Sequence, residues 1–146
     1  MMTGYRGAML GLCLGLGLAA PLGAHAADSQ AEVNEELRAV PKIYNGLFAV
    51  AVANEVRCEC EDIGPRVISA WRFVRGLQAH ARELGYSDEQ AEAFVTDKDE
   101  QDRMQVHVDR YLAENGVTGD DPESYCTLGR AEISAGSQAG QLLYIR

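Results

Sequence analysis

The sequence of 146 residues predicts an all-α fold, a compact bundle of five to six helices held together by one disulfide. Three observations lead to this prediction. Apolar residues recur at helical spacing in several separate segments. Residues that typically start and stop helices flank these segments. Finally, no alternating run of apolar and polar residues is long enough to form a sheet, and the chain contains no internal repeat.

The N-terminus has the three parts of a secretory signal peptide. Its only charge is Arg6, an apolar run extends from Ala8 to Leu22, and an Ala-x-Ala motif ends at Ala26. The apolar run is shorter than the roughly 18 residues that a membrane-spanning helix needs. The sequence therefore predicts that residues 1–26 are a cleaved signal peptide and that the mature protein is periplasmic.

The mature chain begins with a polar N-terminal segment, residues 27–42, which precedes a helical domain, residues 43–146. The polar segment has few apolar residues, so it forms at best a marginal helix, which Pro41 ends. From Ile43 to Val56 the chain is almost wholly apolar, and this length favours a buried central helix over a strand.

The next predicted helix has clear start and stop signals. Asp62 can cap it, Pro65 lies in its first turn, and Gly85 ends it. Its apolar side chains form one stripe at helical spacing: Ile63, Val67, Ala70, Trp71, Val74, Leu77, Ala81 and Leu84. Such a stripe is typical of the side of a helix that faces the core.

A basic stripe lies on the other side of the same predicted helix. Its arginines are Arg66, Arg72, Arg75 and Arg82. In an acidic protein such a stripe can bind an acidic partner, or it can form salt bridges with acidic helices of the same chain. Salt bridges within the chain are the favoured interpretation. The alternative makes the stripe a candidate partner-binding surface.

Three further helices follow. The first opens at a capping box that begins with Ser87, and the second carries an apolar stripe around Val108 and ends at Gly116. The last opens at Asp121 and Pro122, which are typical cap and first-turn residues. It is expected to continue through several small residues that would let another backbone approach closely: Gly129, Ala135, Gly136, Ala139 and Gly140.

The net charge limits the classes of partner. The whole chain has a formal charge of −9, and without Arg6 the mature chain has twelve basic and 22 acidic residues, a charge of −10. This charge repels nucleic acid and anionic lipid. No second hydrophobic segment is long enough to span a bilayer. We therefore expect neither a nucleic-acid partner nor a membrane span after the signal is removed.

The cysteine pattern predicts a disulfide. Cys58, Cys60 and Cys126 follow the signal peptide, and in an oxidising compartment they give one bond and one spare thiol. A bond from Cys58 or Cys60 to Cys126 would join the central helix to the last helix across a loop of about 66 residues, which stabilises the fold by about 4 kcal/mol. A bond between Cys58 and Cys60 would close a strained ring.

Other chemistry at these thiols stays open as an alternative. Cys58 and Cys60 could form a redox couple, or the three thiolates could bind copper or zinc with a histidine. Against this, no metal-ligand motif of typical spacing is present, and the acidic neighbours of the pair disfavour the thiolate form that both chemistries need.

No catalytic signature is present in the sequence. His80 and His107 are read as solvated surface residues, and there is no nucleophile elbow and no glycine-rich phosphate loop. The acidic run 97–102 lacks the central glycine and closing glutamate of a calcium loop. We therefore expect no enzyme activity, no cofactor and no metal.

Three segments of the chain resemble a known family. Two of them are Cys60 to Gly85 and Gly85-Tyr86-Ser87-Asp88, and the third, near the C-terminus, is the most specific. The run Tyr125-Cys126-Thr127-Leu128-Gly129-Arg130-Ala131-Glu132-Ile133, with Gly136-Ser137-Gln138 after it, resembles a family of small exported alphaproteobacterial proteins of unknown function. The resemblance extends over residues 43–143 and implies a periplasmic helical protein without an assigned activity. It also implies that Cys60 pairs with Cys126, which leaves Cys58 as a free thiol, a redox-active thiol or a competitor for the bridge.

These observations give two hypotheses on function. The first is a non-enzymatic periplasmic protein that binds another protein, as an accessory component of the cell envelope. The alternative is a thiol-disulfide or metal-handling protein that uses the Cys-x-Cys pair. The sequence does not define the partner, its ligand or the oligomeric state.

Overall fold

The computed structural model describes residues 29–146, so the predicted signal peptide, residues 1–26, lies outside the described part. Seven helices and two short strands follow one another in this part: α1 (Gln30–Arg38), α2 (Pro41–Glu59), β1 (Ile63–Pro65), α3 (Val67–Glu83), α4 (Asp88–Thr96), α5 (Lys98–Glu114), α6 (Pro122–Ala135), α7 (Gln138–Gln141) and β2 (Leu143–Ile145). The predicted all-α class with one disulfide is confirmed.

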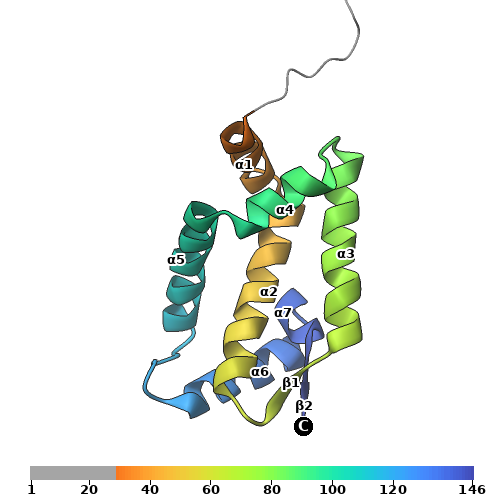
Figure 1. Ribbon diagram of the computed structural model, residues 1–146. Helices are drawn as coiled ribbons and strands as arrows, with labels where there is room; N and C mark the ends of the chain where they lie inside the picture. The colour runs from red at the N-terminus through yellow and green to blue at the C-terminus, as the bar shows by residue number, and fades with distance from the viewer. Residues whose placement is uncertain (1–28) are drawn as a thin grey trace, which may run out of the picture.

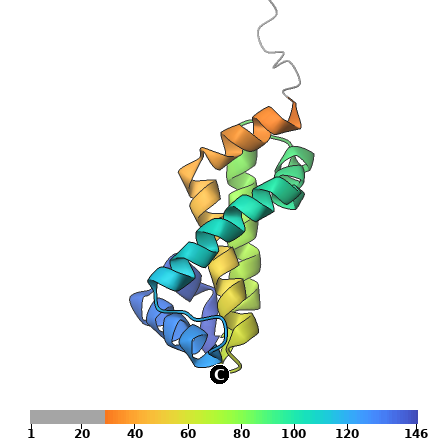
Figure 2. The same ribbon diagram turned by 90° about the vertical axis from the view of Figure 1, so that its left-hand side faces the viewer.

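Helix α2 is the centre of the bundle. It runs between α3 and α5 in Figure 1, and α6 and α7 pack against its lower half. Figure 2 shows the same bundle from the side of α5, with α1 at one end and α6 at the other. The central position explains the composition of α2, because a helix with neighbours on several sides needs apolar residues over most of its surface.

Two clusters of buried side chains hold the helices together. The larger surrounds the lower part of α2 and includes Val56, Ile63, Val108 and Leu143. The smaller lies where α1 and α4 cover the upper part of the bundle, and Val33, Leu37, Ile43, Ala81 and Phe94 form it. The polar N-terminal segment thus does form a helix, and two of its apolar side chains are fully buried.

The predicted start of the third helix is wrong. Residues 63–65 form strand β1, which pairs antiparallel with β2, and α3 begins only at Val67. Asp62 does not cap the helix; its carbonyl oxygen accepts a hydrogen bond of 2.8 Å from the backbone N–H of Arg146. The pairing joins segments about 80 residues apart in the sequence, so the local pattern could not reveal it.

The last predicted helix is divided. Gly136, with a φ of 63°, ends α6 in the left-handed conformation that glycine adopts without strain, and the short helix α7 follows. This division accounts for seven helices in the described residues rather than five or six. Gly140 does lie directly against a helix backbone, at Glu132, but that backbone belongs to the first part of the same predicted helix rather than to another one.

Candidate functional site

The disulfide joins Cys60 at the end of α2 to Cys126 in α6, with a Cα–Cα distance of 5.1 Å. This is the pairing that the family resemblance implies. Both cysteines are buried, whereas Cys58 is exposed and is the one unpaired cysteine among residues 29–146. Within the described residues, no group of three or more His, Cys, Asp or Glu side chains could hold a metal ion.

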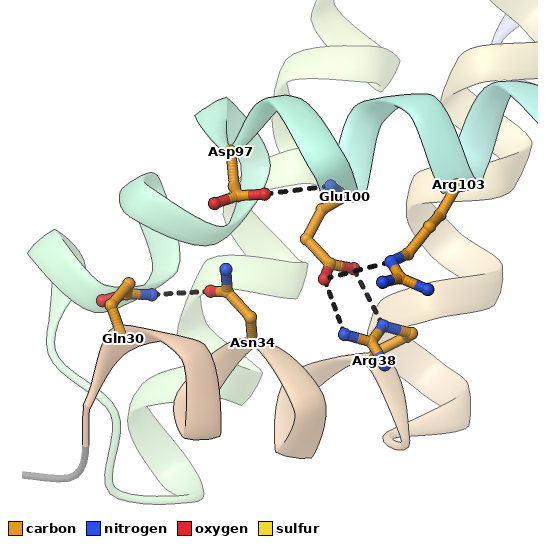
Figure 3. A network of polar contacts seen from close by, with 6 residues as sticks. All are labelled: Gln30, Asn34, Arg38, Asp97, Glu100 and Arg103. Carbon is orange, nitrogen blue, oxygen red and sulfur yellow. Dashed lines mark hydrogen bonds and ion pairs between the residues drawn. The ribbon is translucent and has the colours of Figure 1, made fainter.

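The acidic run at residues 97–102 serves the fold. Asp97 caps α5, and its carboxylate accepts a hydrogen bond of 3.0 Å from the backbone N–H of Glu100. Glu100 is buried and accepts two hydrogen bonds from the guanidinium of Arg38, at 2.9 and 2.6 Å (Figure 3). The Nε atom of Arg103 lies 3.9 Å from an oxygen of the same carboxylate. The network thus fastens the end of α1 to the start of α5.

A second buried carboxylate, Glu132, joins α5, α6 and α7. It accepts hydrogen bonds from the hydroxyl groups of Tyr111 and Ser137. Burial, together with the bond to Glu132, raises the pKa of Tyr111 to about 12. Because both hydroxyls donate to one acceptor in a packed interior, we interpret this group as structural.

This network predicts a dependence of stability on alkaline pH. A phenol whose pKa is raised from 10.0 to about 12 stabilises the fold fully below pH 10, and the contribution is lost as the pH rises toward 12. We expect the free energy of unfolding to fall in that range, and the phenol of Tyr111 to ionise well above pH 10. Absorbance of tyrosinate and urea unfolding at each pH measure both effects. The variant Tyr111→Phe should lose this late ionisation and flatten the pH dependence; an unchanged profile would contradict the assignment.

The two histidines among residues 29–146 lie on helix flanks and contact neighbouring side chains. His80 contacts Glu83 one turn along α3, at 3.2 Å, and the ring of His107 packs edge-on against Tyr44. Neither contact places a nucleophile beside an imidazole, so the described contacts of the histidines suggest no acid–base site.

The outer flank of α3 is exposed and apolar. The prediction that its whole stripe packs on the bundle is wrong, since only Leu77 and Ala81 of α3 are buried. Val67, Ile68 and Trp71 are 62–65% exposed, and Val74 is 43% exposed. The reason is the width of the stripe: with Ile68 it covers roughly half of the helix circumference, more than α2 and α4 can cover. We call the surface formed by Val67, Ile68, Trp71 and Val74 the α3 face.

The four arginines of the predicted basic stripe differ in their contacts within the chain. Two arginines are engaged within the chain: Arg66 donates a hydrogen bond of 2.7 Å to the carbonyl of Leu143, and Arg82 pairs with Asp88 at 2.6 Å. The Arg82 guanidinium holds the pKa of Asp88 below its usual value. Arg72 and Arg75 form no ion pair within residues 29–146.

Arg75 and Arg72 instead border the α3 face. The guanidinium of Arg75 lies over the ring of Trp71, with 5.8 Å between the Cζ atom of Arg75 and the ring centroid. The same guanidinium donates a hydrogen bond to the side-chain oxygen of Gln78. The stretch 63–82 contains four arginines and no acidic residue, whereas the other 100 residues of 27–146 carry eight basic and 22 acidic residues. The α3 face therefore lies in a basic region of an otherwise acidic protein.

An apolar pocket adjoins the α3 face. It has a volume of about 240 Å³ and lies between α3 and α4, above α2. Val74 and Leu77 line it from α3, and Phe94 and Val95 line it from α4. Among the described residues, Gln78 and Glu92 are the only polar ones that line it. Val74 belongs to both surfaces, so the α3 face and the pocket form one continuous apolar area.

The sequence pattern reveals the arginines of this site but not its apolar part. The spacing of Trp71 and Val74 matches that of Leu77 and therefore predicts core positions for both. The expected placement of the whole basic stripe on the other side of the helix is wrong for two of its members. At 100° per residue, Arg75 and Arg82 lie within about 40° of Trp71, on the same side of the helix. Arginines so close to an apolar stripe indicate a boundary with solvent.

Comparison with known proteins identifies the family of this chain. No curated protein and no solved structure matches the chain significantly. None of the helices in residues 29–146 combines the length and the hydrophobicity required to cross a membrane. The model of a family of unknown function, DUF5333, matches residues 35–144, which is 110 of the 146 residues. The protein therefore belongs to the DUF5333 family.

Proposed function

We propose that the protein is a non-enzymatic component of the periplasm that binds another protein through the α3 face. The observation that carries this proposal is Trp71. The side chain of Trp71 is 62% exposed and lies among the exposed side chains of Val67, Ile68 and Val74. In this state it does not gain the favourable free energy that burial of its apolar surface would provide. A partner that covers the face recovers this free energy.

The composition of the face supports a protein partner. Tryptophan and arginine are the residue types most enriched among those that dominate the binding energy of interfaces. Here Arg75 lies over Trp71, and Arg72 is exposed beside it. An apolar centre with charged residues at its border is the usual arrangement of a protein–protein interface.

Two features support export. The first is the signal-like pattern of residues 1–26, which includes a charged start, an apolar run and an Ala-x-Ala motif. The second is the disulfide between Cys60 and Cys126, because such bonds persist in oxidising compartments such as the periplasm. A role as an accessory to an envelope complex fits both features.

Cross-linking in the native cell tests this proposal. A photoreactive phenylalanine analogue is placed at position 71 of the full chain, and, as a matched control, at position 106. Val106 on α5 is an equally suitable site, since it is apolar and 58% exposed. We expect a discrete cross-linked product from position 71 that position 106 does not give.

Two results would contradict the proposal. One is the same set of products from both positions, which indicates random collisions. The other is the absence of any product from position 71 in a protein that is correctly exported and oxidised. Fractionation of the same cells measures export directly, and retention of the chain in the cytoplasm would refute the periplasmic part.

A further inference from the structure

The α3 face is long enough to pack against a helix of a partner, and we call its row of side chains the ridge. Val67, Trp71, Val74 and Gln78 follow one another at spacings of four, three and four residues, so they lie along one side of the helix. At 1.5 Å per residue they span about 16 Å, the length of about three helical turns. The ridge leads at Val74 and Gln78 into the pocket between α3 and α4.

The pocket can receive one large side chain of a docked segment. Nine of its eleven lining residues are apolar, and its volume of about 240 Å³ suits a leucine or phenylalanine side chain rather than a whole ligand with polar groups. An anchor side chain in a pocket beside an apolar ridge is the mode by which amphipathic helices bind to grooves.

The positive charge of the site favours binding of an acidic segment of a partner. Arg72 and Arg75 form no ion pair with a carboxylate of the described residues, and residues 63–82 contain no acidic side chain. The acidic groups near the site belong to α4, where Asp88 interacts electrostatically with Arg75 and Glu92 lines the pocket. The side of α3 that carries Arg72 therefore has the free positive charge. A second copy of the protein is disfavoured, because symmetric pairing of two α3 faces would bring the arginines of both copies together. A basic segment would meet like charges at the same place.

We propose that the segment bound by the α3 face is an acidic amphipathic helix of the partner, with one large apolar side chain in the pocket between α3 and α4. This inference rests on the proposed function, since it names the kind of partner that the face binds. Carboxylates of the helix pair with Arg72 and Arg75, and its apolar side covers Trp71.

Selection from a display library of random 16-residue peptides tests the inference on the mature, oxidised protein. We expect the selected peptides to be acidic, with large apolar residues three or four positions apart. Trp71 is the only tryptophan of the chain, so its fluorescence reports binding directly. Addition of a selected peptide should shift its emission to shorter wavelength.

Variants then distinguish the contribution of the arginine charge to peptide affinity from the contribution of the pocket. Arg72→Glu should weaken binding of a selected peptide about fivefold, whereas the matched control Arg110→Glu, an exposed arginine on α5, should not. Ala91→Leu, which fills the pocket, should weaken binding at least about tenfold. If thermal unfolding shows that Ala91→Leu does not fold, Gln78→Glu replaces it, because it adds a negative charge at the pocket and should also weaken binding.

The outcomes distinguish the inference from the proposed function. Selected peptides that are neutral or basic, or affinities that neither pocket variant changes, overturn the inference, while a specific cross-link from position 71 would still support a protein-binding role. A blue shift of Trp71 with vesicles of anionic phospholipid but with no peptide would identify a membrane surface instead. A dimer that Trp71→Ala dissociates, seen by analytical ultracentrifugation, would identify a second copy.

Discussion

Replacing Cys60 or Cys126 by serine is expected to lower the free energy of unfolding by about 4 kcal/mol. The bond closes a loop of 66 residues, and its loss restores the conformational freedom of that loop to the unfolded chain. Because domains of this size are stable by only about 5–15 kcal/mol, the loss is a large fraction of the total. Urea unfolding followed by circular dichroism measures it.

Cys58→Ser is the matched control. Cys58 lies two residues before Cys60, but it is exposed and unpaired, so we expect its replacement to change stability by less than about 0.5 kcal/mol. Equal unfolding midpoints for all three variants would refute the pairing. Reduction of the unaltered protein should reproduce the loss seen in the Cys126 variant, and should leave that variant itself unchanged.

Replacing Gly140 by alanine is expected to destabilise the protein by about 3 kcal/mol, the upper end of the usual cost of overpacking. A Cβ atom at this position would overlap the carbonyl group of Glu132 and would lie 2.7 Å from the backbone nitrogen of Ile133. Both obstacles are backbone atoms of α6, so no side-chain rotation relieves them. Helix α7 would have to move away from α6, which opens the packing of Ala139 and Leu142, both buried.

Gly76→Ala provides the opposite control. A Cβ atom at Gly76, in the exposed middle of α3, meets no atom within 4 Å. Alanine is the better helix former there, so we expect stabilisation by about 0.5–1 kcal/mol. Thermal unfolding of the two variants should therefore shift in opposite directions, and a Gly140→Ala variant that melts with the unaltered protein would contradict the close packing of α7.

The helices were predictable because their determinants are local. Ser87 and Gln90 form the capping box that the sequence indicates, and Asp121 caps α6 as expected. The apolar run at residues 43–56 does form the central helix, which extends three residues beyond that run to Glu59. Each of these features depends on residues within a few positions of one another, so a single sequence displays them.

The features that the sequence did not reveal depend on distant contacts. The spacing of Ile63 predicts a helix, but its backbone pairs with that of Ile145, far along the chain. The spacing of Trp71 predicts a core position, but its exposure depends on how much of α3 the neighbouring helices cover. The arginines of the candidate site were predictable because charge is visible in the sequence, whereas the pocket arises only when α3 and α4 meet.

The pairing of β1 with β2 also determines when the chain can fold as it is synthesised. Residues 41–65 contribute α2 and β1 early, but α6, α7 and β2, which complete the main cluster around them, are made only with residues 122–145. A nascent chain that has not yet reached Cys126 lacks both the disulfide and much of this cluster. Closure of the fold therefore follows translation of nearly the whole domain, an order that suits the proposed export because an open chain can pass through a translocation channel.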